Sequence, residues 1–262
     1  MKKLNPDSLS VVFALAVTAA VVLCIYFTFR RPDTSSGLTL TPEELALIDS
    51  QDSLMRVFTV ADTSDVRVLR TISRDFSAAD LLTEAYSRLC TLMVATVTSP
   101  AQDGVGIAGP QVGLDRRVVA VQRFDKEGFP FEVYANIRIE EVHGEMVEGP
   151  EGCLSVPGMR GVVMRYPEIV ISYVNVDSLR ASFPTASSYG QGPEHSKSRK
   201  YTAAEALSGK IAGVNLADYT VQETVGGFSA IIFQHETDHL DGILYTDKVV
   251  DGSLACIAPN QK

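Results

Sequence analysis

Two histidines four residues apart, with a glutamate beside the first, carry the clearest chemical signal in this chain of 262 residues. They lie in the run Gln234-His235-Glu236-Thr237-Asp238-His239. On an α-helix, positions i and i+4 lie on one face, so the two imidazoles can bind one metal ion. Glu236 then projects toward the water or substrate held there. The pattern predicts a metal-dependent hydrolase.

The third metal ligand is expected upstream of this helix. The chain has four histidines, and neither His nor Glu follows His239. Downstream, Asp241, Asp247 and Asp251 remain as carboxylate candidates, but Asp241 points off the helical face and the other two follow the helix end. Cys153 is the stronger candidate, because a thiolate is a strong, soft ligand and the glycines near it permit close approach. Cys153 together with His235 and His239 would leave a fourth coordination position on the metal ion for water.

Three motifs, in order along the chain, resemble those of the peptide deformylases, which remove the formyl group from the N-terminal methionine of new polypeptides. They are Gly104-Val105-Gly106-Ile107-Ala108-Gly109-Pro110-Gln111, Glu151-Gly152-Cys153-Leu154-Ser155 and the run from Gln234 to Gly242. A lone HExxH is weak evidence, but three ordered motifs in one domain are hard to obtain by chance. The resemblance implies an α+β deformylase fold, with mixed β-sheets packed around the helix that carries HExxH.

The residue types and the resemblance together predict the reaction. A divalent metal ion on Cys153, His235 and His239 would lower the pKa of its bound water to about 7, so that hydroxide attacks the formyl carbon. Glu236 would take the water's proton and later deliver it to the departing amine. The developing oxyanion needs hydrogen-bond donors: Gln111 can supply a side-chain N–H, and the resemblance implies the backbone N–H of Leu154 as another.

The identity of the metal stays open at this stage. A Cys-His-His set suits zinc by softness and geometry, whereas the resemblance implies ferrous iron, with zinc, nickel or cobalt as substitutes. A sulfur ligand beside iron also predicts loss of activity in air.

The expected partner is an N-formylmethionyl peptide that adds to the domain as a short strand. The backbone groups expected to hold it are those of Val105, Gly106 and Gly152. The side chains expected to form an apolar slot for methionine are Phe228, Ile231 and Ile232, which precede His235 by seven, four and three residues. Core packing is an equally open alternative for these three. Arg160 and Arg165 are interpreted either as surface charges, as contacts to peptide carbonyls, or as partners for Glu151.

One residue of the glycine motif differs from the residue usual in the family that the chain resembles. Gly109 stands where the family usually has Ala, and the absence of a side chain would loosen the loop that positions Gln111. The chain also stops soon after Asp251 without the basic C-terminal helix by which some members dock on ribosomes, so ribosome association stays open.

The N-terminal residues predict a membrane anchor. Leu9 to Phe29 is a stretch of 21 residues without a charge, and as a helix it would be about 31 Å long, close to the thickness of a bilayer core. A buried core helix is the alternative. Lys2 and Lys3 favour a cytoplasmic N-terminus, whereas Arg30 and Arg31 favour a cytoplasmic remainder. Formylated chains and a reduced thiolate place the catalytic domain in the cytoplasm or an organelle interior.

The rest of the chain divides into predicted segments. They are an anchor at 1–31, a tether at 32–53 that includes a helix start at Thr41, a catalytic domain at 54–252 and a tail at 253–262. Within the domain the patterns predict helices at 78–97, with Ser77 as N-cap, and at 224–240, and strands at 118–122, 131–135 and 162–176. Residues 178–220, which include His195, predict a flexible surface insertion. His143 is predicted to lie in an exposed turn.

The net charge of −9 argues against nucleic acid as a partner, because phosphate binding favours a basic surface. Two alternatives to a deformylase remain at this stage. One is a membrane-anchored HExxH metalloprotease, although no downstream Glu or His is available as its third ligand. The other is a catalytically inactive homologue that binds N-terminal peptides, although structural metal sites are usually closed by four protein ligands.

Overall fold

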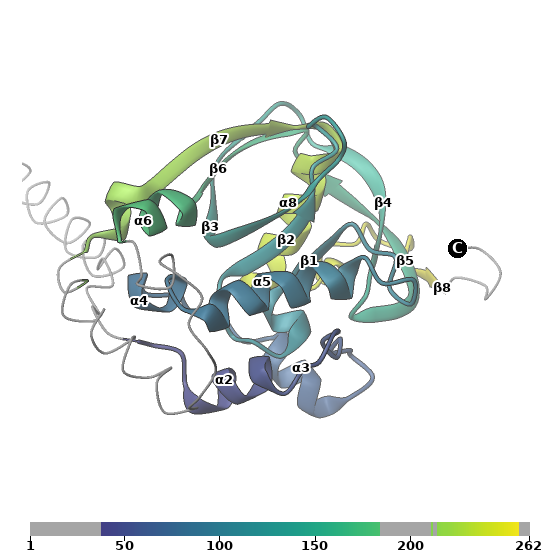
Figure 1. The fold of residues 1–262 in the computed structure, drawn as a ribbon. Coiled ribbons are helices and arrows are strands. Elements are labelled where there is room, and N and C mark those ends of the chain that lie inside the picture. The colour runs from purple at the N-terminus through teal and green to yellow at the C-terminus, as the bar shows by residue number, and fades with distance from the viewer. Residues whose placement is uncertain (1–37, 184–210, 212–213, 257–262) are drawn as a thin grey trace, which may run out of the picture. The chain divides into compact units, whose positions relative to one another are not determined.

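Eight strands form two antiparallel sheets in the part of the chain that the computed structural model describes, residues 38–183, 211 and 214–256 (Figure 1). The five-stranded sheet has the order β1 (Gly106–Ala108), β2 (Val118–Gln122), β3 (Phe131–His143), β6 (Glu168–Val174) and β7 (Thr220–Gly226). The three-stranded sheet has the order β4 (Val147–Cys153), β5 (Val156–Arg165) and β8 (Ala255–Cys256). The prediction of mixed sheets is wrong here, since all pairings between these strands are antiparallel. Short connections such as those from β2 to β3 and from β4 to β5 join only antiparallel neighbours.

Helices cover both faces of the larger sheet. The α-helices are α2 (Pro42–Asp49), α3 (Thr63–Leu69), α4 (Ala78–Leu81), α5 (Glu84–Val97), α6 (Val176–Ser182) and α8 (Gly227–Leu240). Short 3-10 turns are η1 (Gly109–Val112), η3 (Leu216–Tyr219) and η4 (Tyr245–Asp247).

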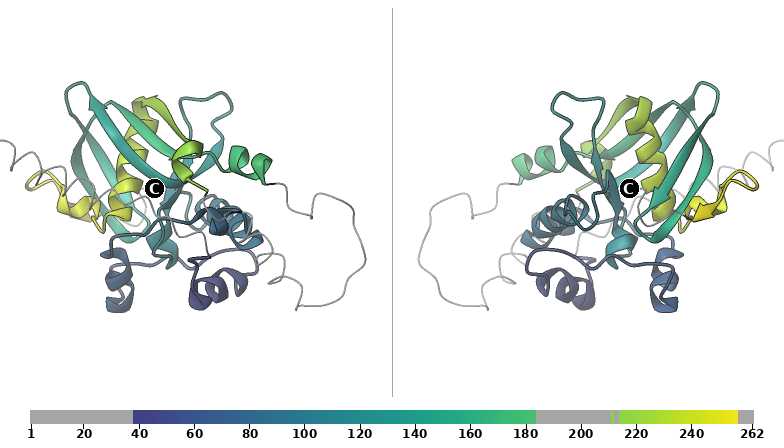
Figure 2. Two further views of the ribbon diagram at one scale, coloured as in Figure 1. Left: turned by 90° about the vertical axis from the view of Figure 1, so that its left-hand side faces the viewer. Right: turned by 90° about the vertical axis from the view of Figure 1, so that its right-hand side faces the viewer.

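The alternation of side chains along β2 shows which helix covers which face. Val118 and Ala120 belong to the apolar cluster that contains α5, whereas Val119 and Val121 belong to the cluster that contains α8. Successive side chains of a strand point to opposite faces, so α5 and α8 pack on opposite sides of the sheet. Figure 2 shows α8, drawn in yellow-green, lying against the strands in both views.

The end of α8 is set by a glycine. Gly242 has φ +72°, and a Cβ there would lie 2.6 Å from the backbone oxygen of Arg70. The Gly242 N–H donates to the carbonyl of His239, and the Ile243 N–H donates to that of Asp238. This is the Schellman arrangement that ends helices at a left-handed residue. It fixes the last turn, which carries His239, and confirms the predicted helix end at Leu240.

Three predicted elements have different bounds in the structure. The helix predicted at 78–97 is two helices, because Thr83 is extended and its side chain accepts a hydrogen bond from the Tyr86 N–H, which starts α5 anew. The helix predicted from 224 starts at Gly227, because residues 220–226 pair with β6 along its whole length. The strand predicted at 162–176 is β5 and β6, which are separated at Tyr166 and Pro167.

Several predicted boundaries also change. The strand predicted at 131–135 continues to His143. The insertion predicted at 178–220 is ordered at its edges, where α6 and η3 lie, and its centre with His195 is outside the described residues. The predicted tail contributes β8, which pairs with β5.

The predicted membrane span at 9–29 lies outside the described residues. None of the helices within the described residues is long and apolar enough to cross a bilayer.

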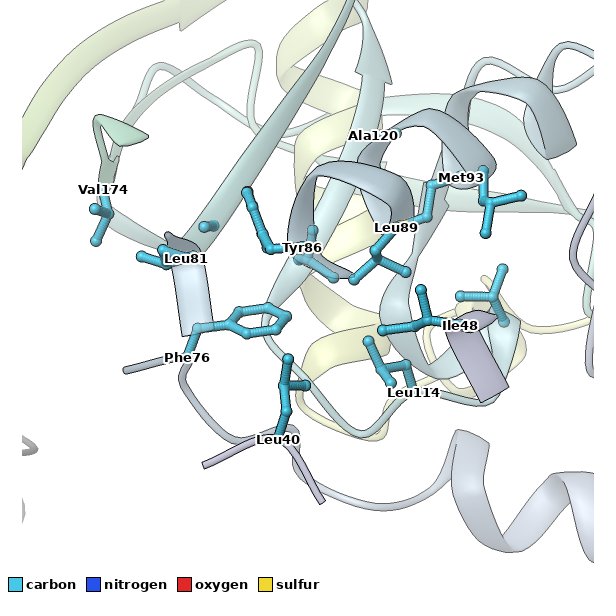
Figure 3. Packing of buried hydrophobic residues seen from close by; sticks show 14 of the residues in the cluster. Leu40, Ile48, Phe76, Leu81, Tyr86, Leu89, Met93, Leu114, Ala120 and Val174 are labelled. Carbon is cyan, nitrogen blue, oxygen red and sulfur yellow. The ribbon is translucent and has the colours of Figure 1, made fainter. Parts of the chain in front are cut away.

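The prediction of a tether up to residue 53 is wrong for its described part. Thr41 caps α2 with Pro42 in the first turn, as predicted, but this helix packs into the domain core. Ile48 is fully buried, and Figure 3 shows it beside Leu114 and Leu89, with Leu40 beneath Phe76.

Polar contacts fix the same segment to the core. The backbone N–H groups of Thr39 and Leu40 donate to Asp80 at 2.8 and 2.9 Å. The buried guanidinium of Arg116 pairs with both carboxylate oxygens of Glu44 at 2.8 Å. Since charged hydrogen bonds between buried groups are costly to leave unmade, these contacts make residues 39–48 part of the folded domain.

Replacing Ile48 by Ala is expected to lower the free energy of unfolding by about 2–5 kcal/mol, the usual cost of such a cavity in a core. Urea denaturation measures this value. Asp49→Ala, at an exposed position of the same helix, is the matched control and is expected to change stability by less than about 0.5 kcal/mol. If both variants change the free energy of unfolding by equally small amounts, the helix is not part of the folded core and the prediction of a tether holds.

Candidate metal centre

Three potential metal ligands converge where β4 ends beside α8. The Sγ atom of Cys153 lies 3.2 Å from Nε2 of His239, and the ligand atoms of Cys153, His235 and His239 all lie within 4.8 Å of one another. The two imidazole centroids are 5.0 Å apart, as expected for positions i and i+4. Cys153 arrives from another element, 82 residues before His235 in the sequence.

The electrostatics of this cluster favour the metal-binding form of the thiol. Burial raises the pKa of Cys153, but the imidazoles of His239 and His235 outweigh it and hold this pKa well below the usual value. For His235, burial lowers the pKa, and hydrogen bonds to Cys153 and Glu151 outweigh it in the other direction. Thiolate and neutral imidazole are the ligand forms, so a metal ion entering this site would displace a proton.

Glu151 orients the first imidazole. Its Oε2 lies 2.8 Å from Nδ1 of His235. Burial raises the pKa of Glu151, but hydrogen bonds from Arg165 and His235 prevail and hold it at about 2. An ionised carboxylate only accepts hydrogen bonds, so Nδ1 is the donor, and in the neutral imidazole Nε2 is the nitrogen that offers its lone pair to a metal ion. Such support of a metal-binding histidine is a common feature of metal sites.

Arg165 connects Glu151 to the motif helix. Its guanidinium donates to both oxygens of Glu151 at 2.7 and 3.0 Å and to Asp238 at 2.6 Å. Asp238 also accepts from Lys248 at 2.6 Å. The Arg165 side chain is only 4% exposed. Of the interpretations open for Arg165, a partner for Glu151 is therefore the one the structure supports, whereas Arg160 is exposed.

Glu236 is buried beside the glycine motif. Burial raises its pKa to about 7 despite the opposing effect of the two histidines. Its Oε2 has no hydrogen-bond partner among the described residues. A Cβ at Gly106 would lie 2.4 Å from Oε1 of Glu236, so only glycine at 106 leaves space for this carboxyl group. Glu236 is thus a buried carboxyl group beside the two histidines, with a pKa that allows it to exchange a proton near neutral pH.

Gln111 lies across the cysteine motif. Its side-chain oxygen accepts from the Ala108 N–H at 2.8 Å, which fixes the amide orientation. Its Nε2 then donates toward Ser155 Oγ at 3.2 Å and Cys153 Sγ at 3.5 Å. The amide N–H groups therefore face Cys153 and its two histidine neighbours, His235 and His239, which together are called the ligand cluster below. Leu154 lies in the turn between Cys153 and Ser155.

Gly109 has a tighter role than sequence reasoning predicts. A Cβ at this position would lie 2.4 Å from the backbone oxygen of Arg116 and 2.9 Å from that of Leu114. The residue therefore permits a close backbone approach at the start of η1, which packs this loop rather than loosening it.

The residues predicted to bind substrate differ in their surroundings. Val105 and Gly106 lie at β1, and Gly152 lies in β4; each strand is at one edge of its sheet in the described chain. Of the predicted methionine slot, Ile232 is buried in the core cluster, Ile231 is half-buried, and Phe228 is 52% exposed and contacts the ring of Phe124 at a tilted angle. Core packing is thus the role of Ile232, while Phe228 remains available at the surface.

The remaining candidates for ligands lie elsewhere. Asp241 pairs with Arg117, and Asp247 pairs with Arg70. His143 is exposed at the end of β3, near Glu141, close to its predicted turn. Among the described residues, the group found that could hold a metal ion is Cys153 with His235 and His239.

Sequence reasoning misses four supporting residues. They are Asp238 and Lys248, which extend the ion pairs of Arg165, Ser155, which accepts from Gln111, and Tyr245, whose buried ring stacks on His235 with centroids 6.1 Å apart. Asp238 lies inside the helix motif and Ser155 is the last residue of the cysteine motif, so membership of a motif is the signal that could have identified these two residues. Tyr245 and Lys248 become partners only through the turn after α8.

The fold and site define a class: an α+β protein with a helix-borne pair of histidines and a distant cysteine that fit a soft divalent metal ion. The donor chemistry, the lowered pKa of Cys153 and the oriented His235 all support this fit. The polypeptide deformylase family model matches residues 56–184 and 208–254. The chain therefore belongs to the polypeptide deformylase family.

Individual relatives agree with this assignment. A peptide deformylase of Symbiobacterium thermophilum is 36% identical over 154 residues, which is 58% of this chain and 51% of that protein, so the chain matches about half of this relative's length. A peptide deformylase of Desulforudis audaxviator is 30% identical over 194 residues, 74% of this chain and 94% of that protein. The Met-ala-ser bound crystal structure of class I type b peptide deformylase from Acinetobacter baumannii has a TM-score of 0.53 at 27% identity, covering 76% of this chain and all of that one.

Replacing Arg165 by Met is expected to destabilise the domain by about 3–5 kcal/mol, because two buried carboxylates lose their shared counter-charge. Urea denaturation measures the difference. Arg160→Met, at an exposed position of the same strand, is the control, with an expected change below about 0.5 kcal/mol. A stability of Arg165→Met equal to that of the control would contradict the role assigned to this guanidinium.

Proposed function

We propose that this protein is a metal-dependent peptide deformylase, which hydrolyses N-formyl-L-methionyl peptides to formate and methionyl peptides. The observation that carries the proposal is the convergence of Cys153, His235 and His239 beside the buried Glu236, within the region matched by the family model. A metal ion on these three residues would supply Lewis-acid activation of water and of the formyl oxygen. Ferrous iron is the proposed ion, with zinc, nickel and cobalt as substitutes.

The residues of the chain account for the remaining requirements of hydrolysis. Glu236, with its pKa raised to about 7 by burial, accepts the proton of the attacking water and delivers it to the departing amine. The Gln111 amide and the Leu154 backbone N–H donate hydrogen bonds to the oxygen that gains negative charge. Glu151 and Arg165 keep His235 in one tautomer, so the arrangement is present before substrate arrives.

A peptide is the substrate class that suits the site. The Acinetobacter relative is described with Met-ala-ser bound. Among the described strands β1 and β4 are sheet edges, and a peptide strand adding there would be held by backbone groups of Val105, Gly106 and Gly152. Such binding reads the main chain and tolerates many sequences. Phe228 and Ile231 are the exposed and half-buried apolar side chains proposed to contact methionine.

Formate release from a formyl-Met peptide by the full-length chain, assayed anaerobically with ferrous iron or with nickel, tests the function. Glu236→Gln is expected to lose activity by at least about 100-fold, because the proton acceptor is gone, while the metal content per protein stays at the wild-type level. Cys153→Ala is expected to lose both metal and activity. Inductively coupled plasma mass spectrometry measures the metal content.

The same assay separates the alternatives. Cleavage of casein or of an unformylated peptide, without formate release, would support a metalloprotease. Binding of peptides without turnover of either substrate would support an inactive homologue. Unchanged metal content and formate release in Cys153→Ala would contradict the proposed ligand set.

We also propose that residues 9–29 anchor the protein in a membrane, with the catalytic domain on the cytoplasmic or organellar side. The support is the uncharged apolar stretch of that segment and its length. Deleting residues 1–31 is expected to move the protein from the membrane to the soluble fraction after cell lysis. As a control, fusing an unrelated membrane span to the deletion variant is expected to return the protein to the membrane fraction. A deletion variant that stays in the membrane fraction would contradict the proposed anchor.

A further inference from the structure

A three-residue segment, Phe58–Val60, bridges the two motif loops that carry the proposed oxyanion donors. The Phe58 N–H donates to the carbonyl of Gln111 at 2.8 Å, and the Val60 N–H donates to the carbonyl of Ser155 at 2.9 Å. Gln111 belongs to the glycine motif, and Ser155 directly follows Leu154 in the cysteine motif. The segment therefore binds the backbone of both loops, which are more than 40 residues apart in the sequence.

The segment is itself held from its other side by a buried carboxylate. The Thr59 N–H donates to Asp65 Oδ2 at 3.0 Å, so all three successive N–H groups are bonded, two to the motif loops and one to Asp65. Asp65 is 1% exposed and pairs with the guanidinium of Arg56 through both oxygens. Since a buried carboxylate is costly without such donors, Asp65 keeps Thr59 in place.

Side-chain packing adds to this fixation on the glycine-motif side. Gly113, which ends η1, has φ +82°, and a Cβ there would lie 2.6 Å from the ring of Phe58. The Arg56 guanidinium covers the same ring, 4.1 Å from its centroid. The ring is therefore enclosed between Gly113 and Arg56, which leaves the glycine-motif loop little room to move toward or away from the segment.

We propose that residues 58–60, anchored by Asp65, are a positioning device that sets the separation of the Gln111 amide and the Leu154 N–H for the transition state. The inference rests on the proposed deformylase function. These residues touch neither the ligand cluster nor the peptide-binding edges through any contact found in the described structure. Their effect is expected on turnover, because donors that act on the developing oxyanion lower the barrier without holding the ground state.

Asp65→Ala tests this proposal in the full-length, metal-loaded protein. It is expected to lower kcat by about 10-fold or more, since displacements of the order of 1 Å are that costly in active sites. KM is expected to change by less than about 2-fold, and metal content is expected to stay at the wild-type value. Asp65→Asn keeps an acceptor for the Thr59 N–H but loses the ion pair with Arg56, so its kcat is expected to stay within about 3-fold of the wild-type value.

Asp62→Ala is the matched structural control. Asp62 is the N-cap of α3, the same helix that carries Asp65, and it accepts from the Ser64 N–H at 2.8 Å. Its loss is expected to lower the melting temperature while leaving kcat unchanged, because it does not bond to residues 58–60 through its side chain. If Asp65→Ala matches Asp62→Ala, with lower stability and a wild-type kcat, the positioning role is overturned.

A second variant covers the case in which Asp65→Ala does not fold. Arg56 is more than half exposed, so Arg56→Gln is expected to fold, to release Asp65 in part and to lower kcat by about 3-fold at an unchanged KM. A wild-type kcat in Arg56→Gln would then overturn the proposal. Failure of the wild-type protein to release formate would instead contradict the proposed function. The formate assay of the wild-type protein therefore distinguishes failure of the function from failure of the positioning role.

Discussion

The ligand cluster depends on one buried guanidinium shared by two carboxylates. Arg165 comes from β5, Glu151 from β4 and Asp238 from α8, so a single side chain joins the small sheet to the motif helix. Burying these charges is unfavourable unless each finds its partners, and the geometry satisfies all of them together. The same contacts that join sheet and helix therefore also orient His235, so stability and ligand geometry have a common origin at this point.

The larger sheet supplies the second constraint. β2 is apolar on both faces, with α5 on one side and α8 on the other. Gly106 in neighbouring β1 has no side chain, and the Glu236 carboxyl group occupies that space. The position of Glu236 is thus a result of packing between a strand and a helix. Its raised pKa follows from the same burial, with no hydrogen-bond partner found in the described residues.

The sequence was sufficient for the motifs and for the elements with a simple pattern. The i and i+4 histidines, the strand at 118–122 and the Thr41 and Ser77 caps are local features, and each is present as predicted. Contacts between segments far apart in the sequence cannot be predicted from such local patterns. Thr83 caps a new helix inside a continuous apolar pattern, residues 220–226 become a strand only because β6 lies beside them, and α2 looks like part of a tether until Ile48 meets its core. Arg165 had three open interpretations, since only the fold brings Asp238 to it.

The attachment of residues 39–48 has a mechanical consequence. Thr39 and Leu40 bond to Asp80, and Glu44 bonds to Arg116, so a pull on the chain ahead of Leu38 would load several hydrogen bonds at once instead of extending a slack linker. Arg116 is only five residues beyond Gln111. Tension on the N-terminal side would thus act first on Asp80 and Arg116, and Arg116 lies close in sequence to the loop that carries this amide.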